Sequence, residues 1–341
     1  MALRVMVTGA TGFVGSHSVR AFVEAGHSVR VLVRDADKVR RVFDPCGVAI
    51  PEKDVVVGDI VDKASVREAM EGCDAVFHCA ALVDLRRGFA QQVLDTNARG
   101  VDLVVGGAAK RGLPSIVYVS SMSIFFYPGA PPLHLDMPVA KGSTAYAQSK
   151  ADAEHVVRRL QDEGASIRCS YPTGIVGPDD PALSDANHAV YTFFAETGIN
   201  TSGYFQIVDV RDLATLHLRQ LELPKGPARH VAAGPSLNWR DTFALLDEIT
   251  GTRVRRFPVS GGVLRGLGRV GDVVKRVRDF NFPLTRDSME YATQWPGADG
   301  SETEKELGIQ FRSAAETYSD TLRWMYRAGH LSARHVGLLA D

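Results

Sequence analysis

The feature that most constrains this chain is a glycine-rich turn near its first residue. Gly9, Gly12 and Gly15 follow one another in the spacing GxxGxxG. The β-branched run Leu3–Thr8 comes directly before the turn, and the helical pattern Val14–Ala25 comes directly after it. Glycines permit a tight turn, a close approach of backbone to a pyrophosphate, and close packing of helix on strand. A plain strand-to-helix turn is the alternative, but the position between a strand and a helix favours a dinucleotide site.

Short apolar runs alternate with helical patterns through the first half of the chain. Strands are predicted over Leu3–Thr8, Ser28–Val33, Asp54–Val57, Ala75–Cys79, Ser115–Ser120 and Ser166–Ser170. Helices are predicted over Val14–Ala25, Val66–Met70, Gln92–Arg111 and Ala145–Gly164. This alternation predicts an α/β fold with a doubly wound parallel sheet.

The alternation changes after Pro172. Residues 174–202 have the composition of a loop-rich insertion, Gln206–Leu221 returns to a strand and a helix, and helices dominate after Gly234. We therefore predict a dinucleotide-binding domain of residues 1–173, to which residues 204–232 return. A smaller, mostly helical substrate-binding domain is predicted over 174–203 and 233–330, followed by a tail over 331–341.

Composition excludes several classes of protein. Apolar residues make up 45% and charged residues 23% of the 341 residues, as in a globular protein, and the net charge of −1 gives no attraction to nucleic acid. The four cysteines lack CxxC spacing, so we expect reduced thiols, no metal site and a cytoplasmic location. No secretory signal and no apolar run of about 18 residues is present, so no transmembrane segment is expected.

One segment carries both apolar and basic residues at helical spacing. It runs from Gly262 to Phe280 and contains Arg265, Arg269, Lys275, Arg276 and Arg278. Such a helix either lies on a membrane surface or packs its Val/Leu face on the body of the protein. We expect the second arrangement, and therefore no peripheral membrane contact.

The end of the second predicted strand bears on the choice between NAD and NADP. An acidic residue there would hold the ribose 2′-hydroxyl of NAD, but this chain has Val33, followed at once by Arg34 and one helical turn later by Lys38. A guanidinium suits a 2′-phosphate, and Asp35 is expected to pair with a neighbouring base. NADP(H) is therefore predicted. NAD(H) is the alternative, in which Arg34 stacks on adenine or stays in solvent.

Other strand ends carry further candidates. Asp59 is suited to accept the adenine amino group, and Ile60 to pack on the ring. The small Ala80 and Ala81 let backbone approach the nicotinamide ribose. The imidazole of His78 could serve as a catalytic base, but we expect it to have a structural role or to lie beside the ribose.

A tyrosine and a lysine stand four residues apart at the start of a predicted helix. Tyr146 and Lys150 therefore share one helix face, and no other tyrosine in the chain has this partner. A phenol has an ordinary pKa near 10, which an adjacent ammonium and an oxidised nicotinamide lower. Ser120 and Ser121 close the fifth strand, where a hydroxyl can hold a carbonyl oxygen.

These motifs, in this order, resemble the extended short-chain dehydrogenases/reductases over about residues 3–235. The resemblance implies that Tyr146 is the general acid/base, that Lys150 binds the nicotinamide ribose, and that Ser121 orients the substrate oxygen. Ser120 and then Ser123 are the alternatives to Ser121. Asn97 matches the asparagine of the helix behind the site. The cofactor-binding set is Gly9, Thr11, Gly12, Phe13, Val14, Gly15, Arg34, Lys38, Asp59, Ile60, Ala80, Ala81, Tyr146, Lys150, Tyr171, Pro172 and Gly174.

Tyr171 is a departure from the family pattern, which usually has arginine before this proline. The change is expected to alter the pocket wall. A homodimer through the helices that carry Asn97 and Tyr146 is expected from the family.

Three functions compete. The segments around Arg34 and Tyr146 look like the dihydroflavonol reductase-like branch, which predicts an NADP(H)-dependent reductase of an aldehyde or ketone. A nucleotide-sugar epimerase or dehydratase with bound NAD is the alternative. Its glycine-rich run with Arg-Asp-Phe is absent from Ser202–Gln206, and Met122-Ser123 replaces the acids of the dehydratases. A redox-silent dinucleotide sensor is the third, and Tyr146 with Lys150 argues against it.

Two groups of residues bear on the class of substrate. A diphosphate could bind Arg253, Arg255 and Arg256, although a solvated face is expected there. An apolar or aromatic substrate is suggested by rings that flank the expected pocket, and these same rings could belong to the core. They are Phe125, Phe126, Tyr127, Tyr191, Phe193, Phe194 and Tyr204.

Overall fold

A seven-stranded parallel sheet forms the centre of the molecule in this computed structural model, which describes residues 2–84, 86–142, 144–196, 198–277 and 285–340. The strand order is β10-β6-β5-β4-β1-β2-β3. This order confirms the predicted doubly wound sheet, in which the carboxyl ends of all strands meet at one edge. The strands are β1 (Arg4–Thr8), β2 (Ser28–Val33), β3 (Val55–Val57), β4 (Ala75–His78), β5 (Ser115–Val119), β6 (Ile167–Pro172) and β10 (Ala228–Ala232).

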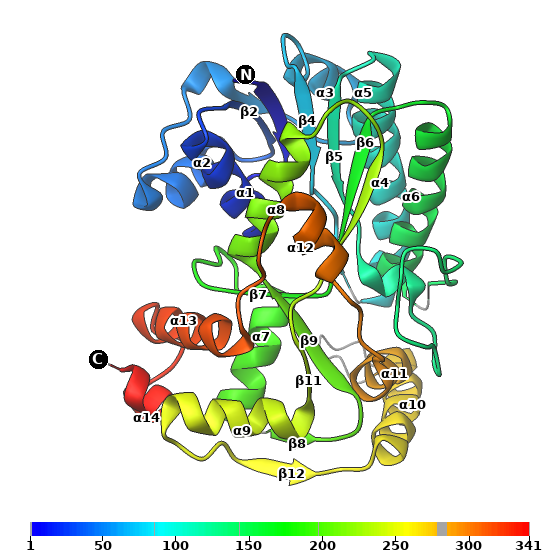
Figure 1. Ribbon diagram of the computed structural model, residues 1–341. Coiled ribbons are helices and arrows are strands. Elements are labelled where there is room, and N and C mark those ends of the chain that lie inside the picture. Colours follow the sequence, from blue (N-terminus) through cyan, green and yellow to red (C-terminus); the bar gives the residue numbers. More distant parts are fainter. Residues whose placement is uncertain (1, 85, 143, 197, 278–284, 341) are drawn as a thin grey trace.

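Helices cover both faces of this sheet (Figure 1). Burial on both sides explains why the strands read as continuous β-branched runs rather than as alternating patterns. On one face, Phe22 packs edge-on against Phe77 with ring centroids 5.3 Å apart. The helices of that face are α1 (Phe13–Glu24), α2 (Ala36–Phe43) and α8 (Val210–Glu222). Those of the other face are α3 (Lys63–Ala69), α4 (Ala90–Val101) and α6 (Ala145–Asp162).

The helix predicted over residues 92–111 is not uniform. It consists of α4, a widened π-type turn at Asp102–Gly106, and the short α5 (Gly107–Lys110). The adjacent Gly106 and Gly107 weaken the preference for α geometry at this point. The hydrophobic pattern could not show this change, because the chain keeps a helical course throughout.

A second, smaller group of elements lies beyond the carboxyl edge of the sheet (Figure 1). In it β9 (Tyr204–Asp209) pairs in parallel with β7 (Gly174–Val176) and antiparallel with β11 (Ser236–Asn238). A further pair consists of β8 (Gly198–Asn200) and β12 (Arg256–Pro258).

The prediction of a loop-rich insertion over residues 174–202 was wrong. This segment holds β7, α7 (Asp185–Tyr191), a π-type turn at Thr192–Glu196, and β8. Strands of three residues are too short to show a hydrophobic period. Of the returning segment, β10 joins the large sheet whereas β9 does not, and the predicted domain boundaries stay a prediction.

The smaller group has its own core, which is mostly helical as expected. Phe243, Leu246, Tyr318 and Leu322 are buried at its centre. None of the helices in the described ranges combines the length and hydropathy that a bilayer crossing requires. The helices that follow β11 are α9 (Trp239–Thr250), α10 (Gly261–Val277), α11 (Arg286–Gln294), α12 (Ser301–Leu307), α13 (Ala314–Arg327) and α14 (Ala333–Val336).

The prediction that the basic amphipathic segment buries its Val/Leu face was also wrong. Leu264 is buried, but the other large apolar side chains described on α10 are exposed: Val263, Leu267, Val270, Val273 and Val274. The physical reason is that glycine, rather than valine or leucine, faces the neighbouring α11, as at Gly268. Residues 278–280, at the end of the predicted segment, lie outside the described residues.

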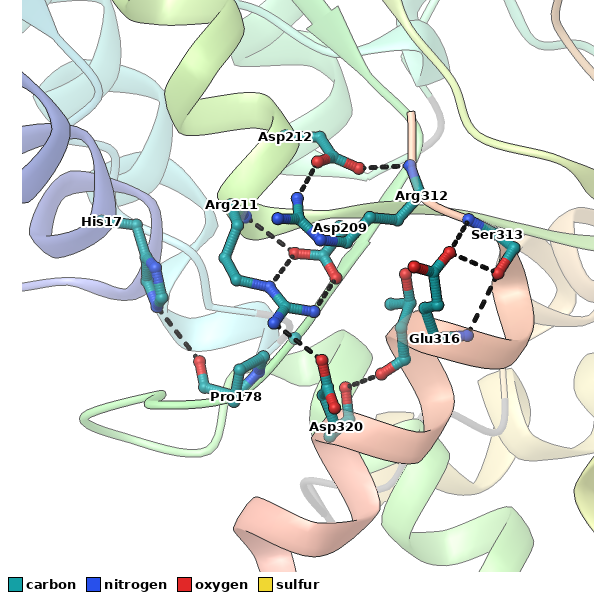
Figure 2. Close-up of polar contacts among 12 residues, drawn as sticks. His17, Pro178, Asp209, Arg211, Asp212, Arg312, Ser313, Glu316 and Asp320 are labelled. Carbon is teal, nitrogen blue, oxygen red and sulfur yellow. Dashed lines mark hydrogen bonds and ion pairs between the residues drawn. The ribbon is translucent and has the colours of Figure 1, made fainter. Parts of the chain in front are cut away.

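A buried ion-pair network ties the smaller group to the sheet (Figure 2). Asp209 caps α8 by accepting a hydrogen bond from the backbone of Arg211. The Arg211 guanidinium donates to both carboxylate oxygens of Asp209, at 2.9 and 2.7 Å, and to Asp320 of α13 at 2.8 Å. Burial by itself would raise the pKa of Asp209, but the hydrogen bonds from Arg211 hold it below its ordinary value. Arg312 pairs with Asp212 beside this network.

Arg211→Ala is expected to lower the free energy of unfolding by about 3 kcal/mol near neutral pH, because it leaves the buried Asp209 carboxylate unpaired. The pKa of Asp209 is lower in the folded chain, so its stabilisation exists above the ordinary aspartate pKa. That stabilisation is lost as pH falls through the folded value. The difference between variant and parent should therefore persist down to about pH 4 and shrink below it, as measured by urea unfolding near pH 7 and near pH 3.

Arg219→Ala is the matched control on the same helix. The side chain of Arg219 is 51% exposed and pairs with the exposed Glu222, so its loss should change the free energy of unfolding by less than about 1 kcal/mol. Equal losses in the two variants, or a loss independent of pH in Arg211→Ala, would contradict the assigned role of the network.

Candidate active site

The glycine turn connects β1 to α1. Neighbouring backbone atoms lie close to Gly9 and to Gly15. Gly9 has a φ of +74°, and its carbonyl oxygen accepts a hydrogen bond of 3.0 Å from the Gly12 amide. A Cβ on Gly9 would lie 2.8 Å from the amide nitrogen of Ala80, and one on Gly15 would lie 2.0 Å from the Gly9 oxygen. Only glycine fits at these two positions.

The first turn of α1 is free to meet an anion. Its N-cap, Gly12, offers no side-chain cap, and no acid stands in the first turn. The amides there point out of the helix end, where they can hydrogen-bond a phosphate. The turn therefore fits the pyrophosphate of a dinucleotide.

A cavity of about 660 Å³ opens beside this turn at the carboxyl edge of the sheet. Predicted site residues from five separate segments line it, which brings the glycine turn and the Tyr-Lys pair to one place. They are Gly9, Gly12, Phe13, Val14, Gly15, Ala81, Ser121, Tyr146, Lys150, Pro172 and Gly174.

Tyr146 and Lys150 lie in the first turns of α6. Thr144 caps this helix by accepting a hydrogen bond from the Ala147 amide. The Lys150 ammonium donates a 2.8 Å hydrogen bond to the carbonyl oxygen of Val119, the last residue of β5, and lies 6.0 Å from the centre of the Tyr146 ring. The helix is thereby fixed to the end of the strand that precedes Ser121.

Burial moves both pKa values of this pair. It lowers the pKa of Lys150 to about 8 and raises the pKa of Tyr146 to about 12, with a smaller contribution to the latter from the negative charge of Asp185. In the protein without a cofactor, the pKa of Tyr146 is therefore raised and not lowered as expected. Tyr146 is a protonated phenol at neutral pH, which suits a proton donor.

Ser121 stands at the cavity directly after β5. Its hydroxyl lies 2.9 Å from the hydroxyl of Ser123 and also accepts a hydrogen bond from the Ser123 amide. Both side chains belong to residues that line the cavity. Ser120 is buried, with its hydroxyl 3.5 Å from a Glu154 carboxylate oxygen. Ser120 also lines the cavity, so all three serine candidates stand at its wall, and the hydroxyls of Ser121 and Ser123 lie within hydrogen-bond distance of each other.

Asn97 is buried in α4 and does not line the cavity. Its side-chain oxygen accepts from the Leu82 amide at 2.7 Å, and its side-chain nitrogen donates to the Leu82 carbonyl and to the Ser149 hydroxyl. Asn97 therefore joins the loop after β4 to the helix of Tyr146. This arrangement is that of a residue that positions the site.

Tyr171 points away from the predicted cofactor position. It is fully buried, and its hydroxyl donates a 2.8 Å hydrogen bond to Glu154 in the core. The expectation that Tyr171 alters the pocket wall was wrong, because successive side chains of a strand point to opposite faces of the sheet. The neighbouring Pro172 lines the cavity instead.

Besides Tyr171, the residues of the predicted cofactor-binding set that lie outside this cavity are Arg34, Lys38, Asp59 and Ile60, which were predicted near the adenosine, and Thr11 and Ala80. Arg34 is exposed at the end of β2, and the described residues offer its side chain no hydrogen bond or ion pair. Asp35 pairs with Arg41 at 2.8 Å, which confirms the expected pairing with a neighbouring base. The guanidinium of Arg34 is thus available to a ligand.

His78 has a structural role, as expected. Its Nδ1 lies 2.6 Å from the hydroxyl of Thr8, and its ring stacks on Tyr118. Burial, with a contribution from Lys150, lowers the pKa of His78 to about 3. A ring with this pKa is neutral and too weakly basic for general-base catalysis near neutral pH.

Sequence reasoning missed the side of the cavity that α7 and α11 form. Asp185 stands at the start of α7, while Asp287, Glu290 and Tyr291 come from α11. Tyr291 packs against Phe126, which also lines the cavity, with ring centroids 5.4 Å apart. These helices lie far along the chain from the recognisable motifs, and their own patterns carry no site signal.

The aromatic residues noted in the sequence divide between cavity and core. Phe126 and Tyr127 line the cavity. Phe125 and Phe194 are buried in hydrophobic cores, against which Tyr191 packs. Tyr204 is exposed outside the cavity, and the side chain of Phe193 lies outside the described part of the structure.

Residues 5–234 match a family described as the NAD dependent epimerase/dehydratase family. The chain belongs to this family. The match confirms the resemblance to the extended short-chain dehydrogenases/reductases and identifies an NAD(P)-dependent enzyme of that superfamily. Among the described residues, no group of three or more His, Cys, Asp or Glu is arranged to hold a metal ion.

Similar proteins include both reductases and epimerases. Sterol demethylase protein B of Methylococcus capsulatus is 26% identical over 336 residues, 96% of this chain and 99% of that protein. A putative dihydroflavonol 4-reductase of Synechocystis is 27% identical over 349 residues, 98% of each chain. A UDP-glucose 4-epimerase structure from Stenotrophomonas maltophila, with bound NAD, has a TM-score of 0.77 at 20% identity and covers 97% of this chain and 100% of its own. The similarity to this last structure shows a shared fold.

Gly15→Ala is expected to weaken dinucleotide binding by at least roughly tenfold, because the new methyl group would lie 2.0 Å from the Gly9 carbonyl oxygen and force the turn open. Fluorescence titration with NADPH and NADH measures the effect. Gly266→Ala is the control, because a Cβ on this helical glycine meets no atom within 4 Å. Unchanged affinity in Gly15→Ala would remove the turn from the binding site.

Proposed function

We propose that this protein is an NADP(H)-dependent reductase that converts an aldehyde or ketone to an alcohol. The observation that carries the proposal is the convergence of Tyr146, Lys150 and Ser121 on the same cavity as the glycine turn. The cytoplasmic location and the homodimer through α4 and α6 stay predictions.

Each residue has a chemical task in this reduction. The chemistry that a reduced nicotinamide would supply, when bound at the glycine turn, is a hydride for the carbonyl carbon. Tyr146 donates its phenolic proton to the carbonyl oxygen, which leaves an alcohol and a phenolate, and water then returns the proton to Tyr146. The nearby Lys150 ammonium favours that phenolate. The Ser121 hydroxyl donates a hydrogen bond that holds the carbonyl oxygen in place.

The high pKa of Tyr146 keeps its phenol in the protonated form that reduction requires. A phenol with a pKa of about 12 is fully protonated near neutral pH, as an acid must be before it donates. Lys150, with a pKa of about 8, is mostly charged under the same conditions.

The walls of the cavity favour an apolar or neutral substrate over a nucleotide diphosphate. Lys141 and Lys150 are the basic side chains among its described lining residues, against the acids Asp185, Asp287 and Glu290. A diphosphate needs several cations or backbone amides at its binding site. The candidate cations Arg253, Arg255 and Arg256 do not line the cavity, and Arg256 pairs with Asp247 at 3.0 Å.

The preference for NADP(H) is supported by the end of β2. The Arg34 side chain has no partner among the described residues, and the acid that would hold a 2′-hydroxyl is replaced by the buried Val33. Asp35 is already engaged, because it caps α2 and pairs with Arg41. A 2′-phosphate would supply Arg34 with a charged partner.

A panel of apolar and aromatic aldehydes and ketones, assayed with NADPH and with NADH, tests the proposed function. Oxidation of NADPH, followed by its absorbance, with formation of the alcohol is the expected result. Interconversion of UDP-glucose and UDP-galactose without added cofactor would instead establish the epimerase. Dinucleotide binding without turnover across the panel and with both sugars would support the sensor.

Tyr146→Phe is expected to lower kcat by about 10²- to 10⁴-fold while NADPH still binds, because the variant loses the proton donor but keeps the aromatic ring. Steady-state kinetics and fluorescence titration measure the two effects separately. Tyr204→Phe removes an exposed hydroxyl outside the cavity and should leave kcat unchanged. Full activity in Tyr146→Phe would rule out the proposed acid.

Arg34→Ala is expected to raise the KM for NADPH by roughly ten- to a hundredfold, because it removes a charged hydrogen bond to the 2′-phosphate. The KM for NADH should change little, since NADH lacks that phosphate. Arg40→Ala, which removes an exposed arginine from the nearby α2, is the control. Equal changes for the two cofactors would contradict the NADP assignment.

A further inference from the structure

The helix α10 packs through glycine and turns its larger apolar side chains outward. A Cβ on Gly268 would lie 2.6 Å from the Thr285 carbonyl oxygen, so the chain just before α11 approaches the backbone of α10 directly. Gly271 and Leu264 are also buried. Figure 1 shows α10 beside α11 at the edge of the molecule. The close contact uses the glycine side of α10, and the larger apolar side chains of the helix stay exposed.

These exposed side chains form a continuous stripe. Leu267 is 47% exposed and Val270 is 59% exposed. Of the thirteen large hydrophobic side chains that are exposed in the described part of the chain, five lie on this one helix, whereas the others are scattered. A cluster of this kind marks an interaction surface. The α10 stripe consists of Val263, Leu267, Val270, Val273 and Val274.

Basic residues border the α10 stripe. With about 100° of rotation per residue, Arg265 and Arg269 fall on adjoining positions beside Val273. Arg265 donates a 2.9 Å hydrogen bond to Thr293 of α11. Arg269 is exposed. The single acid of α10, Asp272, accepts a hydrogen bond from the Arg286 amide of α11. The border of the stripe is therefore positive.

We propose that α10 docks this protein onto the surface of a lipid bilayer with anionic headgroups. The α10 stripe would enter the boundary between headgroups and acyl chains, and Arg269 would meet lipid phosphates. The positive border favours this occupant over a second copy of the chain, whose matching stripe carries the same positive charge. The proposal concerns a surface and does not rest on the proposed reaction.

The position of α10 relates this surface to the cavity. The next helix, α11, contacts α10 and supplies Asp287, Ser288 and Tyr291 to the cavity lining. Docking through α10 would therefore place one wall of the cavity beside the bilayer. An apolar substrate dissolved in the membrane would then have a short path to Tyr146.

Co-sedimentation of the full chain with large vesicles tests the proposal. One set of vesicles is phosphatidylcholine alone, and the other is an equimolar mixture with phosphatidylglycerol. Binding to the anionic set is expected, with little binding to the neutral set. The double variant Leu267→Ser/Val270→Ser should weaken the partition coefficient roughly tenfold or more, because it removes apolar area from the stripe.

Two further variants keep the test specific. Arg269→Gln should weaken binding to anionic vesicles roughly fivefold and leave the apolar stripe intact. The control, Val57→Ser/Leu338→Ser, removes side chains that are 61% and 70% exposed elsewhere and should bind as the parent does. Circular dichroism checks that all variants are folded.

Several results would overturn the proposal. They are equal binding by parent and stripe variant, equal binding to neutral and anionic vesicles, and the absence of vesicle binding. Analytical ultracentrifugation tests the other candidate for the α10 stripe, which is a second copy of this chain. A parent dimer that dissociates in Leu267→Ser/Val270→Ser, without vesicle binding, would assign the stripe to a second copy of the chain.

Discussion

The hydrogen bond from the buried Lys150 ammonium to the Val119 carbonyl oxygen is the interaction on which the candidate site depends. It fixes α6 to the end of β5, and Tyr146 and Ser121 line the same cavity. Asn97 adds a second connection, from the loop after β4 to Ser149 between the two catalytic candidates. Together these contacts hold side chains from three segments at one sheet edge. An ammonium buried for this purpose carries a lowered pKa, which its backbone partner makes tolerable.

The smaller group of elements completes the site from the other side. Its contribution is chemical as well as steric, because Asp185 and Glu290 bring negative charge to a cavity whose other wall holds Lys150. The link between the two groups passes through Arg211, which joins the start of α8, a helix that packs on the large sheet, to α13. The local pairing with Arg211 satisfies the buried Asp209 carboxylate, and the ion pair from Arg211 to Asp320 holds α13 against the start of α8.

The outward face of α10 shows how packing can reverse a simple expectation about amphipathic helices. Valines and leucines at helical spacing normally face the core, and the sequence favoured that arrangement. Glycines at the contact with α11 allow the backbones to approach more closely than side chains could, so the larger apolar residues are left outside. The same geometry sets a basic border beside an apolar stripe, next to the helix that lines the cavity.

The sequence by itself determined the parallel sheet, the glycine turn at the end of β1 and the Tyr146–Lys150 pair, because each rests on spacing within one short segment. It also predicted that Asp35 would form an ion pair with a neighbouring basic residue, which is Arg41. Only the tertiary structure decided that Tyr171 faces the core, that Ser123 accompanies Ser121, and that α7 and α11 close the cavity. These facts depend on which face of an element meets another segment, and contacts between segments far apart in the chain leave no local pattern.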